Sequence, residues 1–123
     1  ARECLYAGIR AAKAGDRLQR ISRAVYDHAR KENYGIVHQY CGHGVGFDIH
    51  EDPVVMNIPR GANPRLSAGM VLAIEPMVNL GTADTRGPFA DGWTVYTADG
   101  QPSAHFEQTV AITEDGPLVL TAE

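Results

Sequence analysis

Residues 70–80 read Met-Val-Leu-Ala-Ile-Glu-Pro-Met-Val-Asn-Leu, an almost continuous apolar stretch that contains one acid, Glu75. Such a run is typical of a β-strand that is buried on both faces. Burying a lone carboxylate is costly unless it is paired or bound to a metal. Glu75 therefore belongs to a functional site, or it pairs with an arginine, or it marks a strand end exposed to water, as the following Pro76 indicates.

The chain after this run alternates in the manner of antiparallel strands. Strands are predicted over residues 93–97, 103–113 and 117–121, with Asp-Gly turns at 99–100 and 115–116. In the second of them, His105, Glu107 and Thr109 are expected on one face. Glu107 is thus expected in mid-strand, either as a ligand or as part of a stripe that faces solvent.

The first third of the chain is predicted to be helical. Leu5, Ile9 and Ala12 recur at helical spacing, and a second apolar stripe runs through residues 17–33 after a break at Ala14-Gly15-Asp16. A short strand is expected at 36–37, and loops at 57–69 and 81–92. Helices that come first and antiparallel strands that come later indicate the α+β class.

Length and composition fit one folded domain over residues 1–123. The chain has 44% hydrophobic and 21% charged residues, which excludes a disordered tail. The net charge of −4 argues against a nucleic-acid partner, and no apolar run is long enough for a membrane span. Two cysteines without CxxC spacing favour a reducing compartment, so we expect a cytoplasmic protein with neither nucleic-acid nor membrane partners.

Two histidines lie in the stretch CGHGVGFDIHED at residues 41–52. His43 is flanked by glycines, which allow close approach of a metal or substrate, although a turn histidine is the alternative. His50 lies beside two acids, and a surface position is equally open. Together with Glu75 and Glu107, this mixture of nitrogen and oxygen donors suits Mn, Fe, Co or Zn. HExxH, GxSxG, Walker A and GxGxxG motifs are absent.

Three ordered segments resemble the type I methionine aminopeptidases: residues 41–55, residues 68–79, and residues 91–115 with DGWTVYTADG followed by SAHFEQTVAITED. The resemblance spans nearly the whole chain but covers only the C-terminal half of such an enzyme. It implies half of the "pita-bread" fold, in which helices pack on a curved antiparallel sheet. It also implies that an N-terminal half is missing, to be supplied by a partner segment or replaced by self-association.

The resemblance implies a metal site as well. The family holds two divalent ions with two aspartates, one histidine and two glutamates. His43, Glu75 and Glu107 match the last three of these ligands, whereas the aspartates lie upstream of the matched region. We therefore expect one metal or none in this chain, and weak or absent activity of the chain alone.

The implied reaction removes the N-terminal methionine from nascent proteins and peptides. In the family a metal-bound hydroxide attacks the methionine carbonyl. Glu75 would be ligand and proton shuttle, and His50 would donate a hydrogen bond to the developing oxyanion. Trp93 and Ile49 match residues that line the methionine pocket. Ile49 stands where an aromatic residue is usual, and Gln108 stands where a histidine is usual.

Two other functions stay open at this point. X-Pro aminopeptidases and prolidases share the Gly-His-Gly loop and the Ile-Glu-Pro strand, although the Asp-Gly-Trp-Thr segment favours methionine specificity. The second alternative is a binding module that keeps the fold and has lost catalysis. The absent aspartates favour this alternative, and the four retained residues His43, His50, Glu75 and Glu107 oppose it.

Overall fold

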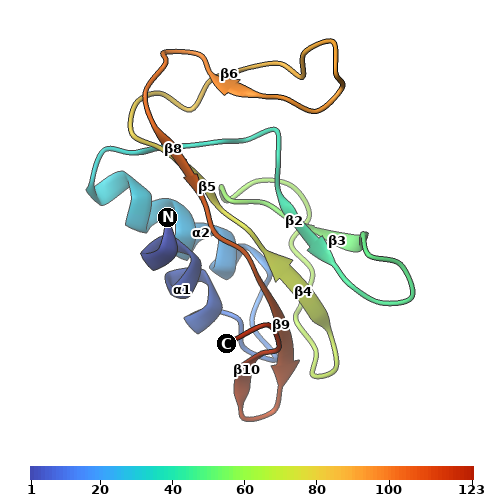
Figure 1. The fold of residues 1–123 in the computed structure, drawn as a ribbon. Helices are drawn as coiled ribbons and strands as arrows, with labels where there is room; N and C mark the ends of the chain where they lie inside the picture. The colour runs from blue at the N-terminus through green and yellow to red at the C-terminus, as the bar shows by residue number, and fades with distance from the viewer.

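Two helices come first in the chain and pack against the strands that follow, as Figure 1 shows for the computed structural model of residues 1–123. The elements in chain order are α1 (Arg2–Arg10), α2 (Gln19–Lys31), β1 (Gly35–Ile36), β2 (Gly42–Gly44), β3 (Glu51–Val55), β4 (Val71–Ile74), β5 (Met77–Asn79), β6 (Thr85–Arg86), β7 (Tyr96–Thr97), β8 (Ser103–His105), β9 (Gln108–Thr113) and β10 (Gly116–Val119). The α+β class is therefore confirmed, as are both helices.

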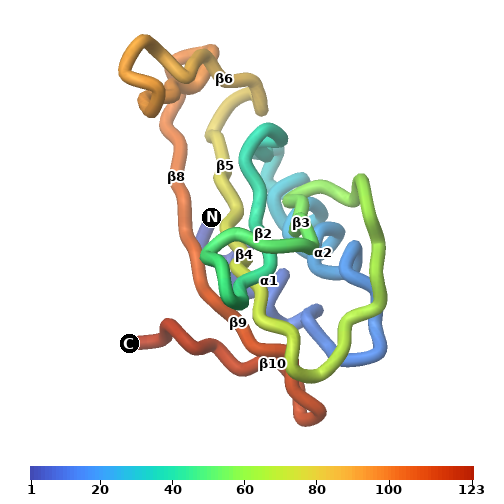
Figure 2. The backbone as a smooth tube through the Cα atoms, turned by 90° about the vertical axis from the view of Figure 1, so that its right-hand side faces the viewer, coloured from blue at the N-terminus to red at the C-terminus, as the bar shows by residue number.

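The strands form one principal sheet and two smaller ones. The principal sheet has the order β10-β9-β4-β2-β3, and all its pairs are antiparallel. A second sheet has the order β1-β5-β8, and β6 pairs with β7 in a separate hairpin. Figure 2 shows this hairpin at one end of the molecule and the turn between β9 and β10 at the other.

The prediction of two long uninterrupted strands is wrong at one point in each. The run 70–80 is divided at Glu75-Pro76 into β4 and β5, and the run 103–113 is divided at residues 106–107 into β8 and β9. Pro76 has no N–H to donate to a neighbouring strand, so the ladder is interrupted there. Glu107 consequently lies in the break between two strands rather than in mid-strand.

Other strands also differ from the prediction. The strand expected at 93–97 is limited to Tyr96–Thr97, and the last strand begins and ends earlier, at Gly116–Val119. Sequence reasoning missed β2, β3 and β6, and β6 lies within the loop that was expected at 81–92. Pro53 within β3 argues against a strand. β3 tolerates this proline because it lies at the edge of the principal sheet.

The helices cover one face of the principal sheet, and the core lies between the two layers. Leu5 of α1 and Ile21 of α2 pack there with Leu72 of β4 and Val110 of β9, and all four are at most 1% exposed. A smaller cluster, with Val25 of α2, fills the space under the second sheet. Neither helix is long and apolar enough to cross a membrane.

Candidate metal centre

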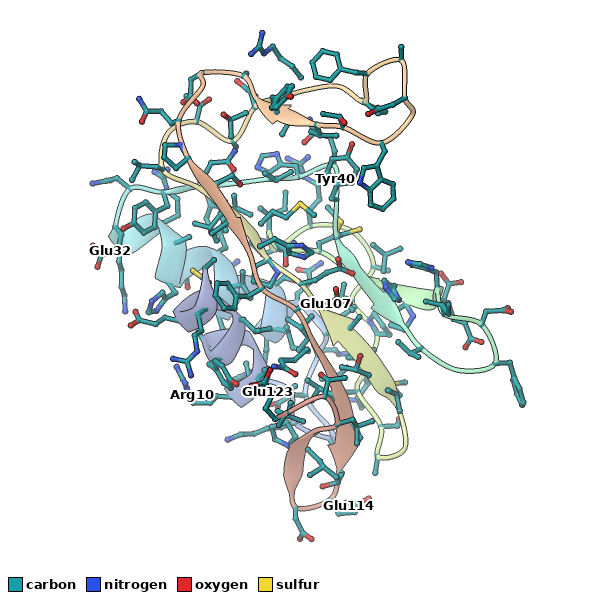
Figure 3. The ribbon with its side chains drawn as sticks, viewed as in Figure 1. Arg10, Glu32, Tyr40, Glu107, Glu114 and Glu123 are labelled. Carbon is teal, nitrogen blue, oxygen red and sulfur yellow. The ribbon has the colours of Figure 1, made fainter.

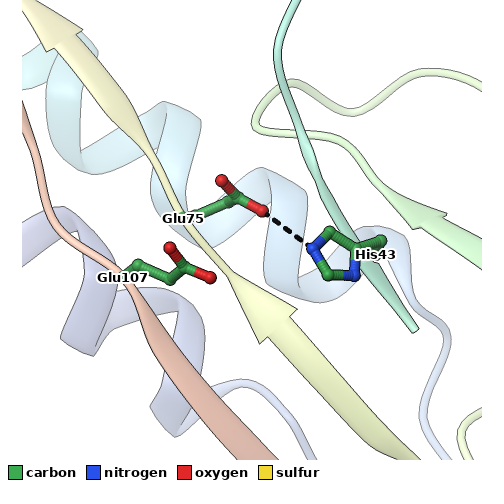
Figure 4. A group of neighbouring side chains, drawn as sticks. All are labelled: His43, Glu75 and Glu107. Carbon is green, nitrogen blue, oxygen red and sulfur yellow. Dashed lines mark ion pairs between the residues drawn. The ribbon is translucent and has the colours of Figure 1, made fainter. Parts of the chain in front are cut away.

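Three side chains from separate parts of the chain meet on the side of the sheet away from the helices. His43 of β2, Glu75 after β4 and Glu107 before β9 each place one potential ligand atom within 4.8 Å of the others. Figure 4 shows both carboxylates and the imidazole turned toward one another, with the helices behind the strands. His43 Nε2 lies 3.3 Å from Glu75 Oε1.

The strand register explains why the two carboxylates meet. Ile74 pairs with Gln108 in one sheet and Met77 pairs with His105 in the other, so the register is the same on both sides of the break. Counting inward from either side places Glu75 opposite Glu107. Like charges directly opposite each other in an antiparallel pair are unfavourable, and a cation between them would remove this repulsion.

β2 brings the imidazole to the same place. His43 pairs with Ala73, which lies two residues before Glu75 and so on the same face of β4. The flanking glycines are needed for this approach. A Cβ at Gly42 would lie 2.1 Å from the Ala73 carbonyl oxygen, and one at Gly44 would lie 2.1 Å from the Asp52 carbonyl oxygen.

The hydrogen bonding of His43 leaves one ring nitrogen for a ligand. Its Nδ1 lies 2.9 Å from the Gly44 carbonyl oxygen, an acceptor, so Nδ1 carries the proton. In the neutral ring, Nε2 then offers a lone pair toward the Glu75 carboxylate. Two lone pairs face each other unless a proton or a cation lies between them. This donor set therefore fits a divalent ion.

Burial and charge raise the pKa of the Glu75 carboxyl above its usual value. Burial is the largest cause, and the neighbouring Glu107 acts in the same direction. His43, His105 and His50 oppose both effects. The side chain of Glu75 is only 14% exposed, whereas Glu107 is exposed. Of the alternatives for Glu75, the pair with an arginine is not found, because its ion pairs are with His43 and His105.

His50 lies beside the cluster, and so does a histidine that sequence reasoning missed. The rings of His43 and His50 are 4.1 Å apart between centroids. His105 Nε2 lies 3.5 Å from Glu75 Oε2. His105 could have been predicted, because it lies two residues before Glu107 and the two side chains were expected on the same face of the strand.

Ile49 and Trp93 lie on different elements. Ile49 is 75% exposed in the loop between β2 and β3. Trp93 is 87% exposed in the segment between β6 and β7, where it lines a cavity of about 700 Å³ together with Tyr40 and Met77. Ile49 does not line this cavity.

Two more polar side chains near the site have defined surroundings. Asn79 lines the same cavity, is fully buried, and its Oδ1 has no hydrogen-bond partner. Sequence reasoning missed Asn79, although it is the single amide side chain within the apolar run 70–80. Gln108, at the position where the family usually has histidine, accepts a hydrogen bond from the Thr121 hydroxyl.

Comparison with known proteins identifies the family. Residues 1–114 match the sequence model of metallopeptidase family M24. The chain belongs to metallopeptidase family M24. A metallopeptidase needs ligands for its metal, and His43, Glu75 and Glu107 are the M24 chain's one group of histidine and carboxylate side chains close enough to hold an ion.

Among curated M24 relatives, the chain is similar to methionine aminopeptidases. It is 54% identical to that of Treponema pallidum over 121 residues and 51% identical to methionine aminopeptidase 1 of Bacillus subtilis over 120 residues. Each match covers 97% of this chain but 47% or 48% of the relative. The chain thus spans about half the length of these relatives and corresponds to their C-terminal half.

Solved structures agree with the sequence relatives. Methionine aminopeptidase from Rickettsia prowazekii has a TM-score of 0.94 at 38% identity, and the match covers 98% of this chain and 49% of that one. The Thermotoga maritima enzyme has a TM-score of 0.93 at 41% identity, with coverages of 99% and 49%. Prolidase from Pyrococcus furiosus reaches 0.74 at 26% identity, covering 99% and 30%. The chain therefore has the fold of one half of these two pita-bread enzymes.

Proposed function

We propose that the chain contributes to metal-dependent removal of the N-terminal methionine from nascent proteins and peptides. The observation that carries this proposal is the His43, Glu75 and Glu107 cluster in a chain about half identical to methionine aminopeptidases. The Pyrococcus furiosus prolidase is less similar in both sequence and fold, which disfavours an X-Pro substrate.

We assign the metal to His43 Nε2 and to the carboxylates of Glu75 and Glu107. The candidate ions are Co, Mn, Fe and Zn, since imidazole and carboxylate donors suit all four. The chemistry supplied by such an ion is polarisation of the scissile carbonyl and activation of water. Three protein ligands leave coordination positions open for one ion, so we expect one bound metal or none in this chain, where the family uses two.

The other residues have roles in proton transfer and substrate binding. Glu75 is partly buried and its pKa is raised above the usual value of a carboxyl, so it suits a group that accepts and returns a proton. His50, beside His43, is placed to donate a hydrogen bond to a carbonyl oxygen that gains charge. Trp93 lines the cavity that we assign to the methionine side chain. Ile49 does not line this cavity, and its assignment to substrate binding rests on the family resemblance alone.

We propose that residues 1–123 form one domain, the C-terminal half of a methionine aminopeptidase catalytic domain. The two upstream aspartates of the family would then come from a second half-domain, or activity would stay weak. Self-association is the other means of covering the open side of the sheet. We place the protein in the cytoplasm, where new polypeptides are made, and both cysteines are free, as expected in a reducing compartment.

Metal titration of the purified chain tests the site directly. We expect Co²⁺ or Mn²⁺ to bind one site per chain by calorimetry. His43→Ala and Glu107→Gln should each weaken binding at least about tenfold, because loss even of groups that support ligands costs 10–100-fold. Glu114→Gln is the control, because it removes an exposed acid at the distant β9–β10 turn (Figure 3). Equal affinity in all four proteins would refute the site.

A chimera tests the reaction. The chain would replace the matched half of the Thermotoga maritima methionine aminopeptidase, with which it shares 41% identity. We expect the chimera to release methionine from a Met-Ala-Ser peptide and to leave an Ala-Pro peptide uncut. The isolated chain should show little activity. His43→Ala in the chimera should abolish release.

Each alternative has its own outcome in these experiments. Cleavage of Ala-Pro peptides in preference to Met-Ala-Ser would favour the X-Pro peptidases. A chimera that binds metal normally and cuts neither peptide would favour a binding module. Both results would contradict the proposed methionine specificity, and neither would bear on the metal ligands.

A further inference from the structure

The hairpin of residues 81–102 forms one wall of the cavity beside Trp93. Eight of the thirteen residues that line the cavity belong to this hairpin, and the other five belong to the body of the molecule. Within the hairpin, β6 and β7 pair with each other and form a sheet of their own, which Figure 2 shows at one end of the molecule. The width of the cavity therefore depends on how the hairpin is held against the body.

Two side chains grip the hairpin at its base, and both do so through the backbone of Thr82. Asn79, the last residue of β5, donates a hydrogen bond from Nδ2 to the Thr82 carbonyl oxygen at 2.9 Å. The Thr82 N–H donates to Asp99 Oδ2, on the returning leg of the hairpin, at 2.8 Å. We call Asn79, Thr82 and Asp99 the clasp. It links the body to one leg of the hairpin and that leg to the other.

The surroundings of the clasp hold it in one arrangement. Asn79 is fully buried, which fixes the orientation of its side chain. Asp99 Oδ1 accepts a second hydrogen bond, from the Gln101 N–H at 3.0 Å, so both carboxylate oxygens are used. The backbone N–H groups of Thr82 and Gln101 keep the pKa of this carboxyl below its usual value. A Cβ at Gly81 would lie 2.0 Å from Asp99 Oδ2, so the clasp requires glycine there.

The tip of the hairpin is fixed separately from its base. Asp91 Oδ1 accepts hydrogen bonds from the backbone N–H groups of Trp93 and Thr94, at 3.0 and 2.9 Å. The Phe89 N–H donates to the Thr94 carbonyl oxygen at 3.0 Å. These contacts set the backbone of Trp93 relative to the tip, whereas the clasp sets the hairpin relative to the body. Loss of the clasp should therefore move the hairpin as a unit, with Trp93 on it.

We propose that Asn79 and Asp99 are positioning residues for substrate binding, because they hold the hairpin at the angle that makes Trp93 a wall of the cavity. This role rests on the proposed function, in which the cavity receives the methionine side chain. Both residues act through Thr82 rather than on the reacting atoms. A site that is formed for only a fraction of the time binds its ligand more weakly by that fraction. The clasp thus contributes to affinity by keeping the cavity formed before substrate arrives.

Amide relaxation measured by NMR on the full chain tests the clasp without substrate or metal. Asp99→Ala removes both hydrogen bonds of an exposed carboxylate and leaves the core unchanged. We expect the order parameters of the β6 and β7 amides to fall from about 0.85 toward about 0.6, the values of rigid and flexible backbone, while those of β4 stay the same. Asp115→Ala is the control. It removes an exposed acid at the other Asp-Gly turn, whose hydrogen bond to Thr113 uses its backbone N–H rather than its carboxylate.

Kinetics of the Thermotoga maritima chimera test the effect on substrate. Asp99→Ala should raise KM for the Met-Ala-Ser peptide about tenfold, which corresponds to a hairpin seated about one-tenth of the time, and should leave kcat unchanged. Asp99→Asn keeps one acceptor oxygen, so its KM should lie between those of the wild type and the alanine variant. Asp115→Ala should match the wild type.

Gly81→Ala gives an independent check that keeps the carboxylate in the chain. Its Cβ would displace Asp99 Oδ2 from the Thr82 N–H, so it should raise KM as Asp99→Ala does. Unchanged order parameters in β6 and β7, an unchanged KM in Asp99→Ala, or an equal change in Asp115→Ala would each overturn the proposal. A wild-type chimera that releases no methionine would instead contradict the proposed function, whereas the relaxation data on the chain would still test the clasp.

Discussion

Glu75 shows how one residue combines poor solvation with a functional position. Its carboxylate is mostly buried, faces Glu107 across the strand break and has only histidines as partners. In the absence of metal its charged form is disfavoured by burial and by Glu107, and its pKa is raised. The same arrangement becomes favourable when a divalent ion neutralises both carboxylates.

Replacement of this carboxyl should change stability in a pH-dependent way. Folding raises the pKa of Glu75, so the folded chain binds more protons than the unfolded chain. The stability of the fold therefore falls as the pH rises from 4.5, the ordinary pKa of this carboxyl, through its higher pKa in the folded chain. Glu75→Gln removes this loss. We would measure the free energy of unfolding in urea, with EDTA present, at pH 4 and at pH 7. The difference between variant and wild type should be more favourable to the variant at pH 7 than at pH 4. A difference independent of pH would contradict this.

The elements of the sheet depend on the helices that cover one of its faces. Leu72 of β4 is completely buried beneath α1, whereas Leu118 of β10 is 55% exposed. The apolar residues of β4 thus anchor this strand on the helices, and Glu75 follows directly after it. Packing at this strand therefore controls the geometry of the metal centre.

These two leucines make a matched pair for stability measurements. Leu72→Ala should cost about 2–5 kcal/mol of unfolding free energy, because it removes buried methyl groups and leaves a cavity. Leu118→Ala should change stability by less than about 0.5 kcal/mol, since its side chain is largely in water. Denaturant unfolding measures both. A cost at Leu118 equal to that at Leu72 would show that the exposed side of β10 is covered in solution.

At the scale of the whole molecule, the chain is a two-layer unit whose open side carries the candidate metal centre. The strands that carry His43, Glu75 and Glu107 belong to one antiparallel network, and the helices support it from the other face. Because unfolding separates these ligands along the sequence, metal binding and folding must be coupled.

Metal should therefore stabilise the entire chain. At a free concentration about 100 times the Kd, a ligand that binds only the folded state adds about 2.7 kcal/mol, which corresponds to an increase in Tm of about 10 °C for a domain of this size. Thermal unfolding with and without Mn²⁺ measures this shift. His43→Ala should abolish it, while Glu114→Gln should keep it. A shift that persists in His43→Ala would place the ion elsewhere.

The local sequence determined the two helices, the α+β class and the presence of an acid, Glu75, within an apolar strand. The helical spacing of Leu5 and Ile9 and the single acid in residues 70–80 are local patterns, so they could be read without coordinates. The nitrogen and oxygen donors of His43, Glu75 and Glu107 suggested a divalent ion, and the resemblance to a family matched these three residues to its ligands. Tertiary structure decided that Glu75 and Glu107 face each other, that Pro76 divides the strands, and that His105 joins the cluster. Strand pairing joins residues far apart in the chain, and its register depends on long-range contacts that no local pattern encodes.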